Sequence, residues 1–309
     1  MAGPRVAVLM AVRNGGGHLS EQLATLAAQD HRDWALLVGD DGSTDDSAAR
    51  ISAFAETHHA LRIPGPGQGA AANFLHLLTR APDLLPEHPW VALSDQDDLW
   101  HPDRLSRGLQ ALAALPGDVP ALWCARVMVA DGGGRPLRLS PPRPRPLSFA
   151  NALVQNVVPG NTVLLNPAAA RLAAQAAPEA GRVVVHDWWL YQIVTGAGGT
   201  VLHEDSPALL YRQTGGNQIG ANDRPRDKMR RLAGLIGGTA QGWSDTNIAA
   251  LRASAHRLTP ENRRLLEAFA ALRAAPLPRR LRALRRIRLY RQGTAARVTL
   301  WLAALLGRL

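Results

Sequence analysis

Short apolar runs alternate with amphipathic segments over the first hundred residues. Residues 6–12 (VAVLMAV), 34–38 and 90–93 are brief and rich in aliphatic side chains, as expected of strands buried on both faces of a parallel sheet. Residues 19–28 and 45–57 repeat apolar positions at helical spacing. This alternation predicts an α/β fold with a mostly parallel sheet covered by helices on both faces.

The next hundred residues give weaker signals of the same kind. A helix is expected over residues 70–78, and further short strands over 121–129, 162–165 and 183–185. Residues 140–147 (SPPRPRPL) are too rich in proline for a regular helix or an internal strand. We therefore expect an extended loop there.

The basic charge of the chain is confined to its C-terminal part. Residues 1–223 hold 16 basic and 21 acidic residues, whereas residues 224–309 hold 19 basic and 4 acidic residues. Because the main part is acidic and the tail has few aromatic side chains, nucleic-acid binding is not expected. We expect a boundary near Asn222, between a domain of residues 1–222 and a basic helical region of residues 223–309.

The apolar pattern of the basic region allows two interpretations. Leu281, Leu284, Ile287 and Tyr290 share one face of a predicted helix that carries many arginines. Such a helix could lie on an anionic membrane surface. Alternatively, it could pack on the acidic domain or on a second copy of the chain, which leaves a homo-oligomer open.

Nothing in the sequence predicts export or a membrane span. The first apolar run, residues 6–12, lacks a basic start and a cleavage site, and no apolar stretch of about 20 residues occurs. Cys124 is the single cysteine, so an internal disulfide is excluded. A cytoplasmic protein is expected, with peripheral contact to the inner face of the membrane as one option.

Carboxylates gather directly after two of the predicted strands. Asp40 and Asp41 follow the second strand, and Asp95, Asp97 and Asp98 follow the third. The carboxyl ends of strands in an open α/β sheet face the ligand crevice. Carboxylates this close together repel one another unless a cation neutralises them, and Mg²⁺ or Mn²⁺ would do so while leaving places for pyrophosphate oxygens. A solvated acidic loop or a capped helix start is the alternative.

Six segments spread over residues 5–222 resemble motifs of a known family. They are residues 6–15 (VAVLMAVRNG), 37–45 (LVGDDGSTD), 92–100 (ALSDQDDLW), 159–161 (PGN), 186–189 (HDWW) and 211–217 (YRQTGGN). The first three resemble the family-2 glycosyltransferases, which have a GT-A type nucleotide-sugar-binding fold. The last three resemble the rhamnosyltransferase-like branch of bacterial surface-polysaccharide enzymes.

The resemblance implies roles at the matching positions. Donor-binding roles fall on Ala11, Arg13, Asp40, Asp41, Asn73 and Asp95, metal-binding roles on Asp95 and Asp97, and the role of general base on Asp187. Many relatives have an aromatic residue in place of Arg13 and a histidine in place of Thr214. If that histidine binds metal in relatives, the metal site here has one protein ligand fewer.

Acceptor binding is expected from a separate group of residues. Trp188 and Trp189 could stack on the apolar face of a sugar, and Gly160 and Asn161 could shape the acceptor pocket. The alternative for the tryptophans is a place in the core, beside an Asp187 that only caps a helix.

The predicted reaction is inverting transfer of a sugar to a hydroxyl group. It requires a carboxylate to take the proton of the acceptor and positive charge beside the departing diphosphate. By resemblance, dTDP-L-rhamnose is the favoured donor and a UDP-hexose stays open. The acceptor would be a glycan, lipid-linked or polymeric, in cell-surface polysaccharide synthesis.

Two rival functions remain at this point. Gly65, Gly67 and Gly69 imitate a dinucleotide-binding loop, which would indicate an oxidoreductase, although such a loop normally follows the first strand. Clustered carboxylates would repel the pyrophosphate of that cofactor. The second rival is a sugar-nucleotide or glycan-binding protein without activity, for which Thr214 is the main support.

Overall fold

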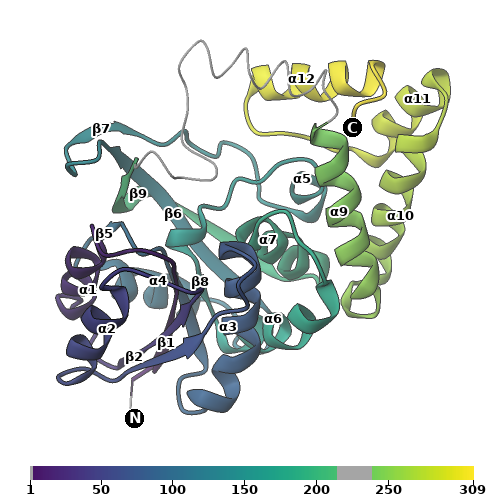
Figure 1. Cartoon of the computed structure of the whole chain (residues 1–309). Coiled ribbons are helices and arrows are strands. Elements are labelled where there is room, and N and C mark those ends of the chain that lie inside the picture. Colours follow the sequence, from purple (N-terminus) through teal and green to yellow (C-terminus); the bar gives the residue numbers. More distant parts are fainter. Residues whose placement is uncertain (1–2, 214–238) are drawn as a thin grey trace.

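The computed structural model describes residues 3–213 and 239–309. One sheet runs through the molecule with helices on both faces (Figure 1). The strands are β1 (Val6–Val12), β2 (Trp34–Asp40), β3 (Ala60–Pro64), β4 (Trp90–Ser94), β5 (Leu99–Trp100), β6 (Ala121–Ala130), β7 (Pro136–Leu139), β8 (Leu164–Leu165) and β9 (Thr200–Arg212). The helices before the gap are α1 (Leu19–Ala27), α2 (Ser47–Ala55), α3 (Ala70–Leu84), α4 (Arg104–Ala113), α5 (Phe149–Ala152), the short 3₁₀ helix η1 (Gly160–Thr162), α6 (Pro167–Ala180) and α7 (His186–Gly196). Those after it are α9 (Thr239–Ala253), the 3₁₀ helix η2 (Ala255–Arg257), α10 (Pro260–Ala274), α11 (Leu277–Ile287) and α12 (Thr294–Leu305).

The sheet has the strand order β3-β2-β1-β4-β8-β6-β9-β5, and β7 pairs with β6. Strands β3, β2, β1 and β4 are parallel to one another, and β8 runs antiparallel to its neighbours β4 and β6. Strands β6 and β9 are parallel to each other. The predicted α/β fold with a largely parallel sheet is confirmed.

Side chains of β1 alternate between two hydrophobic layers. Ala7 and Leu9 belong to the layer that contains α3, α6 and α7, and Val8 and Met10 belong to the layer that contains α1 and α4. Because every side chain of this strand except Ala11 is buried, the strand needs apolar residues at successive positions. The carboxyl ends of β1, β2 and β4 then lie together at one edge of the sheet.

Three sequence expectations differ from the structure. β3 was not expected from the sequence; it is an edge strand ending at Pro64, a position where proline costs no sheet hydrogen bond. β9 was not expected, since Glu204, Asp205 and Pro207 interrupt its apolar pattern. Residues 183–185 form no strand and instead lead into α7.

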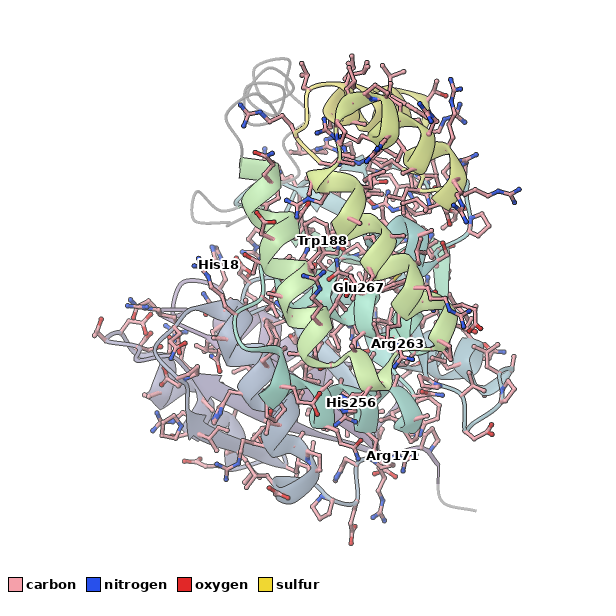
Figure 2. The ribbon with its side chains drawn as sticks, turned by 90° about the vertical axis from the view of Figure 1, so that its right-hand side faces the viewer. His18, Arg171, Trp188, His256, Arg263 and Glu267 are labelled. Carbon is pink, nitrogen blue, oxygen red and sulfur yellow. The ribbon has the colours of Figure 1, made fainter. Side chains whose placement is uncertain are left out.

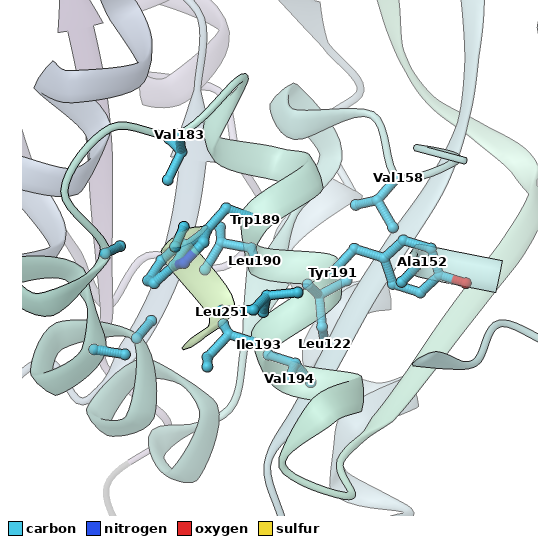
Figure 3. Close-up of a cluster of buried hydrophobic side chains, with 14 of the residues drawn as sticks. Leu122, Ala152, Val158, Val183, Trp189, Leu190, Tyr191, Ile193, Val194 and Leu251 are labelled. Atoms are coloured by element: carbon cyan, nitrogen blue, oxygen red, sulfur yellow. The ribbon is translucent and has the colours of Figure 1, made fainter. Parts of the chain in front are cut away.

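The C-terminal helices share the core of the sheet. Leu251 of α9 and Phe269 of α10 are at most 1% exposed, and they belong to the same buried cluster as Leu122 of β6 and Trp189 of α7. Figure 3 shows Leu251 among the side chains of α7, and Figure 2 shows the C-terminal helices covering one side of the molecule. The expected boundary near Asn222 lies outside the described residues.

The predicted apolar face of α11 packs on the rest of the protein. Leu284 is 2% exposed, and Leu281 and Ile287 pack against the main core. Tyr290, just after the helix, donates a hydrogen bond from its hydroxyl to the Pro146 carbonyl at 2.6 Å. These four side chains therefore pack on the protein itself and are not the ones that would enter a membrane. Among the described residues, no helix is both long and apolar enough to cross a bilayer.

Candidate active site

A cavity of about 620 Å³ opens where β1, β2 and β4 end. Its floor comes from residues 11–13, 41 and 95–97, and its opposite wall from residues 156–161 and 185–187. Most of the residues expected from the sequence to have a functional role line this one cavity. The exceptions are Asp40, Trp188 and Trp189.

The acidic loop after β4 presents two of its three carboxylates to the cavity. Asp95 and Asp97 line it, whereas Asp98 is fully buried and turned into the protein. Between the two, Gln96 accepts a hydrogen bond from the Arg13 amide at 2.9 Å and donates one to the Arg13 carbonyl at 3.2 Å. Gln96 was not anticipated from the sequence, and it ties the acidic loop to the end of β1.

Asp95 and Asp97 suit a divalent cation that substrate oxygens complete. Burial, together with the negative charges of Asp97 and Asp187, raises the pKa of Asp95 to about 7. No group of three or more histidine, cysteine or acidic side chains arranged for a metal occurs in the part of the chain that the structure describes. Mg²⁺ is commonly held by one or two carboxylates together with substrate phosphates, so this pair fits such an ion.

A buried cation lies beneath the acidic loop. The Arg104 guanidinium stacks over the Trp100 ring, 3.4 Å from its centroid. Its Nη2 atom donates to three carbonyl groups, those of Leu93, Asn161 and Val163, at 3.0, 2.8 and 3.3 Å. Arg104 thereby joins the end of β4 to the turn η1, and sequence reasoning did not single it out.

Asp98 shares this buried layer. Its Oδ2 atom accepts a hydrogen bond from Asn161 Nδ2 at 2.6 Å. Burial raises the pKa of Asp98 well above its usual range, while burial lowers the pKa of Arg104 to about 9 against the opposing attraction of Asp98 and Asp95. The alternative that Asp97 or Asp98 caps a helix does not apply, because α4 begins at Arg104 with Asp103 at its cap position.

The two carboxylates after β2 have different surroundings. Asp41 lines the cavity, and its two oxygens accept hydrogen bonds from the Gly67 and Gly69 amides at 2.6 and 2.8 Å. Asp40 instead accepts from the Ser43 amide and from Arg62, at 2.9 and 3.0 Å, outside the cavity. The expectation that Asp40 binds the donor is not retained.

The glycine loop does not form a dinucleotide site. Gly67 and Gly69 direct their amides at the Asp41 carboxylate, which places a negative charge where a pyrophosphate would have to bind. Both glycines have positive φ angles, of 71° and 88°, so the loop requires residues without a Cβ there. The loop holds the Asp41 carboxylate in place, so the structure does not support the alternative that the protein is a dinucleotide-dependent oxidoreductase.

The remaining donor-side residues form the wall beside β1. Ala11 and Arg13 line the cavity, as does Asn73, which donates to the Gly39 carbonyl at 2.7 Å. Phe74 stacks on His186 with ring centroids 3.9 Å apart, and burial lowers the pKa of His186 to about 3. The histidine ring is thus an uncharged part of the wall.

Asp187 is held across the cavity from the acidic loop. Its Oδ1 atom accepts hydrogen bonds from Asn156 Nδ2 at 2.9 Å and from the Trp188 amide at 2.6 Å. Its Oδ2 atom accepts one from the Gly160 amide at 3.1 Å. Burial raises the pKa of Asp187 to about 6, and these three bonds oppose that rise. Asp187 lies in the first turn of α7 and is not its cap, which is Val185.

The two tryptophans after Asp187 turn away from the cavity. Trp189 has no exposed surface and lies in the core, as Figure 3 shows. The Trp188 indole donates to the Ala152 carbonyl at 2.7 Å and packs edge-on against Trp243. Successive helical residues are rotated by about 100°, so Trp188 and Trp189 face the protein while His186 and Asp187 face the cavity. The expectation that these tryptophans stack on the acceptor is not retained.

The acceptor side of the cavity is formed by other residues. Gly160 and Asn161 line it as expected, and Arg143 adds a guanidinium from the proline-rich loop. Arg143 is held by the Val157 and Pro141 carbonyls at 3.0 and 2.6 Å. No sequence signal distinguished Arg143 from the other arginines of the chain. The positions Thr214 and Asn217 lie outside the described residues.

Comparison with known proteins decides the family. The family model described as "Glycosyl transferase family 2" matches residues 7–170, more than half of the chain. The chain belongs to glycosyl transferase family 2. The protein is therefore a nucleotide-sugar glycosyltransferase of this family.

Individual relatives of this family 2 enzyme are distant. It is 24% identical over 235 residues to the dTDP-rhamnosyl transferase RfbG of Shigella flexneri, covering 74% of this chain and 78% of the relative. It is 31% identical over 110 residues to the putative glycosyltransferase EpsE of Bacillus subtilis (strain 168), covering 34% and 37%. A crystal structure of residues 1–349 of TarS from S. aureus in complex with UDP-GlcNAc superposes with a TM-score of 0.53 at 12% identity, covering 81% of this chain and 71% of that TarS chain. The last comparison supports the GT-A fold.

Proposed function

We propose that this family 2 enzyme is an inverting glycosyltransferase in which Asp187 is the general base. The observation that carries the proposal is that one cavity holds Asp187 on one wall and the Asp95–Asp97 pair on the other. A base is needed at the attacking hydroxyl, and negative charge leaves on the diphosphate, so the two functions belong on opposite sides of the transferred sugar.

Asp95 and Asp97 would hold Mg²⁺ or Mn²⁺ together with the donor diphosphate. The bound ion supplies positive charge that stabilises the leaving diphosphate. Asp41 supports the nucleotide side through its clamp on the glycine loop, and Ala11 and Arg13 complete that side.

The hydrogen bonds that Asp187 accepts leave its carboxylate able to accept one more, from the acceptor hydroxyl. A carboxylate offers about four lone-pair sites, so three accepted bonds leave roughly one site for the acceptor hydroxyl. The acceptor oxygen attacks the anomeric carbon, its proton passes to Asp187, and the bond from that carbon to the diphosphate oxygen breaks. Gly160, whose amide holds Asp187 Oδ2, keeps the carboxylate oriented throughout.

The favoured donor is dTDP-L-rhamnose, and the acceptor is a lipid-linked or polymeric glycan of the cell surface. Support for the donor comes from the relative named as a dTDP-rhamnosyl transferase, at 24% identity. The TarS structure contains UDP-GlcNAc, which makes a UDP-hexose the alternative donor.

Calorimetric titration tests the donor site first. dTDP, UDP, GDP and NAD are titrated with and without Mn²⁺, and we expect Mn²⁺-dependent binding of dTDP that is tighter than that of UDP. Tighter UDP binding would replace the rhamnosyl donor by a UDP-hexose. Absence of binding by every nucleoside diphosphate would contradict the proposed function.

Replacement of Asp187 tests the chemistry separately. Asp187→Asn should lower kcat by about 10²–10⁴-fold, because the base is lost, while dTDP binding stays unchanged. Asp205→Asn, an exposed carboxylate on β9, is the control and should have full activity. Equal turnover by the wild type and Asp187→Asn would remove Asp187 from the reaction, and no turnover by either would favour a binding protein.

A further inference from the structure

Helix α12 is apolar on two opposite faces. Leu300, Ala303 and Ala304 are at most 2% exposed and belong to the core. The outward face carries Val298, Trp301, Leu302, Leu305 and Leu306, with exposed fractions between 36% and 62%. These five residues, which we call the α12 stripe, follow the i, i+3, i+4, i+7, i+8 spacing of one helix face.

The α12 stripe concentrates the exposed apolar surface of the protein. Eight large hydrophobic side chains are exposed in the part of the chain that the structure describes, and five of them form the stripe. Scattered exposed leucines are ordinary, whereas a contiguous patch indicates an interaction surface. Figure 1 shows α12 along the top edge of the molecule, above α9, beside α11 and far from β1 and β2.

Arginines border the α12 stripe. Residues 277–309 contain nine arginines and no lysine, aspartate or glutamate. Arg280 holds α11 against α12 through a hydrogen bond to the Ala304 carbonyl at 3.1 Å. The Arg285 guanidinium lies 5.8 Å from the centroid of the Trp301 ring, and Arg282 and Arg286 are exposed on the same helix. Within residues 277–309, apolar and cationic side chains therefore occur together with no acidic side chain among them.

We propose that the α12 stripe docks on the surface of an anionic lipid bilayer. A helix with twelve residues is about 18 Å long, too short to span a bilayer but long enough to lie in its interface. Its leucines would enter the acyl boundary, Trp301 would sit at headgroup level, and the arginines of α11 would contact lipid phosphates. A second copy of the chain is a poorer partner, because a symmetric contact would bring two sets of arginines together.

The segment between α11 and α12 connects this surface to the cavity. Gln292 exchanges hydrogen bonds with the backbone of Arg145, at 2.9 and 3.0 Å. Tyr290 bonds to the Pro146 carbonyl and to the Ser148 hydroxyl. The loop held in this way supplies Arg143 to the acceptor side of the cavity. A docked α12 would therefore fix the acceptor side relative to the bilayer; this consequence, unlike the docking itself, rests on the proposed function.

Vesicle co-sedimentation of the full chain tests the docking without any donor or acceptor. We expect binding to vesicles of phosphatidylglycerol and phosphatidylcholine, weaker binding to phosphatidylcholine alone, and a decrease with added salt. The triple variant Leu302→Ser, Leu305→Ser, Leu306→Ser should lower the partition coefficient at least about tenfold. Because these side chains are exposed, the variant should keep the wild-type melting temperature.

Two further variants separate the contributions. Leu137→Ser removes an equally exposed leucine from β7, at 61% exposure, and should bind vesicles like the wild type. The variant Arg282→Gln, Arg285→Gln, Arg286→Gln should bind anionic vesicles about as weakly as neutral ones.

Four outcomes would overturn the proposal. They are no binding to anionic vesicles at low salt, equal binding to neutral and anionic vesicles, equal binding by the stripe variant and the wild type, and a dimer in sedimentation equilibrium that the stripe variant dissociates. The last would make the α12 stripe a contact between copies. Since nucleotide binding is measured separately, none of these results bears on the donor site.

Discussion

Asp187 must be ionised to accept a proton, yet burial favours its neutral form. Its pKa is raised to about 6 by burial, and three hydrogen bonds from Trp188, Gly160 and Asn156 limit the rise. At saturating metal we expect kcat/KM to fall about tenfold per pH unit below about pH 6 and to level off above it. A profile that is flat between about pH 5 and 7 would contradict the role of base.

Asn156 should influence the pH below which kcat/KM falls. Its amide bonds to the charged form of Asp187 and so lowers the pKa of that carboxyl. Asn156→Ala removes the bond, and the acid limb of the profile should move to higher pH by about one unit. The neighbouring Gln155→Ala is the control: Gln155 contacts Asn151 and Gln292 rather than Asp187, and its acid limb should stay in place. Identical limbs in the two variants would contradict this account.

Arg104 should contribute to the stability of the fold as well as to the arrangement of the candidate active site. It is 1% exposed, and it satisfies three carbonyl groups and lies beside the buried acidic loop. Arg104→Met should lower the free energy of unfolding in urea by about 3 kcal/mol, since it leaves buried carboxylates and carbonyls without their cation. Arg171→Met, on an exposed side chain labelled in Figure 2, should change it by less than about 0.5 kcal/mol. Equal changes would show that Arg104 is not a structural cation.

At the level of elements, one ion pair joins α6 to η2. Glu179 accepts hydrogen bonds from Arg257 and Ser254, and the Arg257 bond in particular lowers the pKa of Glu179 to about 2. The folded pKa is depressed, so this contribution is fully present above the ordinary value of 4.5 and is lost as pH falls toward 2.

The exposed ion pair between Arg252 of α9 and Glu267 of α10 serves as the control for the Glu179–Arg257 pair. Arg257→Ala should lower the free energy of unfolding by about 1–2 kcal/mol at neutral pH and by less at pH values below about 4. Arg252→Ala breaks the pair with Glu267, whose side chains are 50% and 51% exposed, and should cost below about 1 kcal/mol. Chemical unfolding at the two pH values measures both, and a loss for Arg257→Ala that does not depend on pH would contradict the linkage.

The ends of the strands could be predicted from the sequence, whereas the directions of several side chains could not. Asp95 and Asp97 were located because a carboxylate directly after a buried strand must lie at the sheet edge. Trp189 was misplaced, since the rotation of α7 about its axis depends on packing against α3, α5 and α6. Arg104 and Gln96 were missed because their roles consist of contacts with residues far away in the chain. Local patterns carry no information of that kind.

For the whole molecule, the shared core predicts one cooperative unit. The charge difference along the sequence indicated two parts, but Leu251 of α9 is fully buried in the cluster that contains Trp189 and Leu122. Calorimetry should show a single unfolding transition with equal calorimetric and van't Hoff enthalpies. Leu251→Ala should shift that whole transition to lower temperature, by about 2–5 kcal/mol of stability. Two resolved transitions, of which the variant shifts only one, would contradict a common core.

The turn η1 contacts residues on both sides of the cavity. Gly160 holds the proposed base Asp187 through its amide, and the next residue, Asn161, holds Asp98 of the acidic loop. Two adjacent residues thus connect the proposed base to the acidic loop, so a shift on one side of the cavity is transmitted to the other. We expect ordered kinetics, in which the donor binds first. Substitutions near η1 that change the donor preference should also alter the affinity for the acceptor. Initial-rate patterns with varied donor and acceptor would reveal that order.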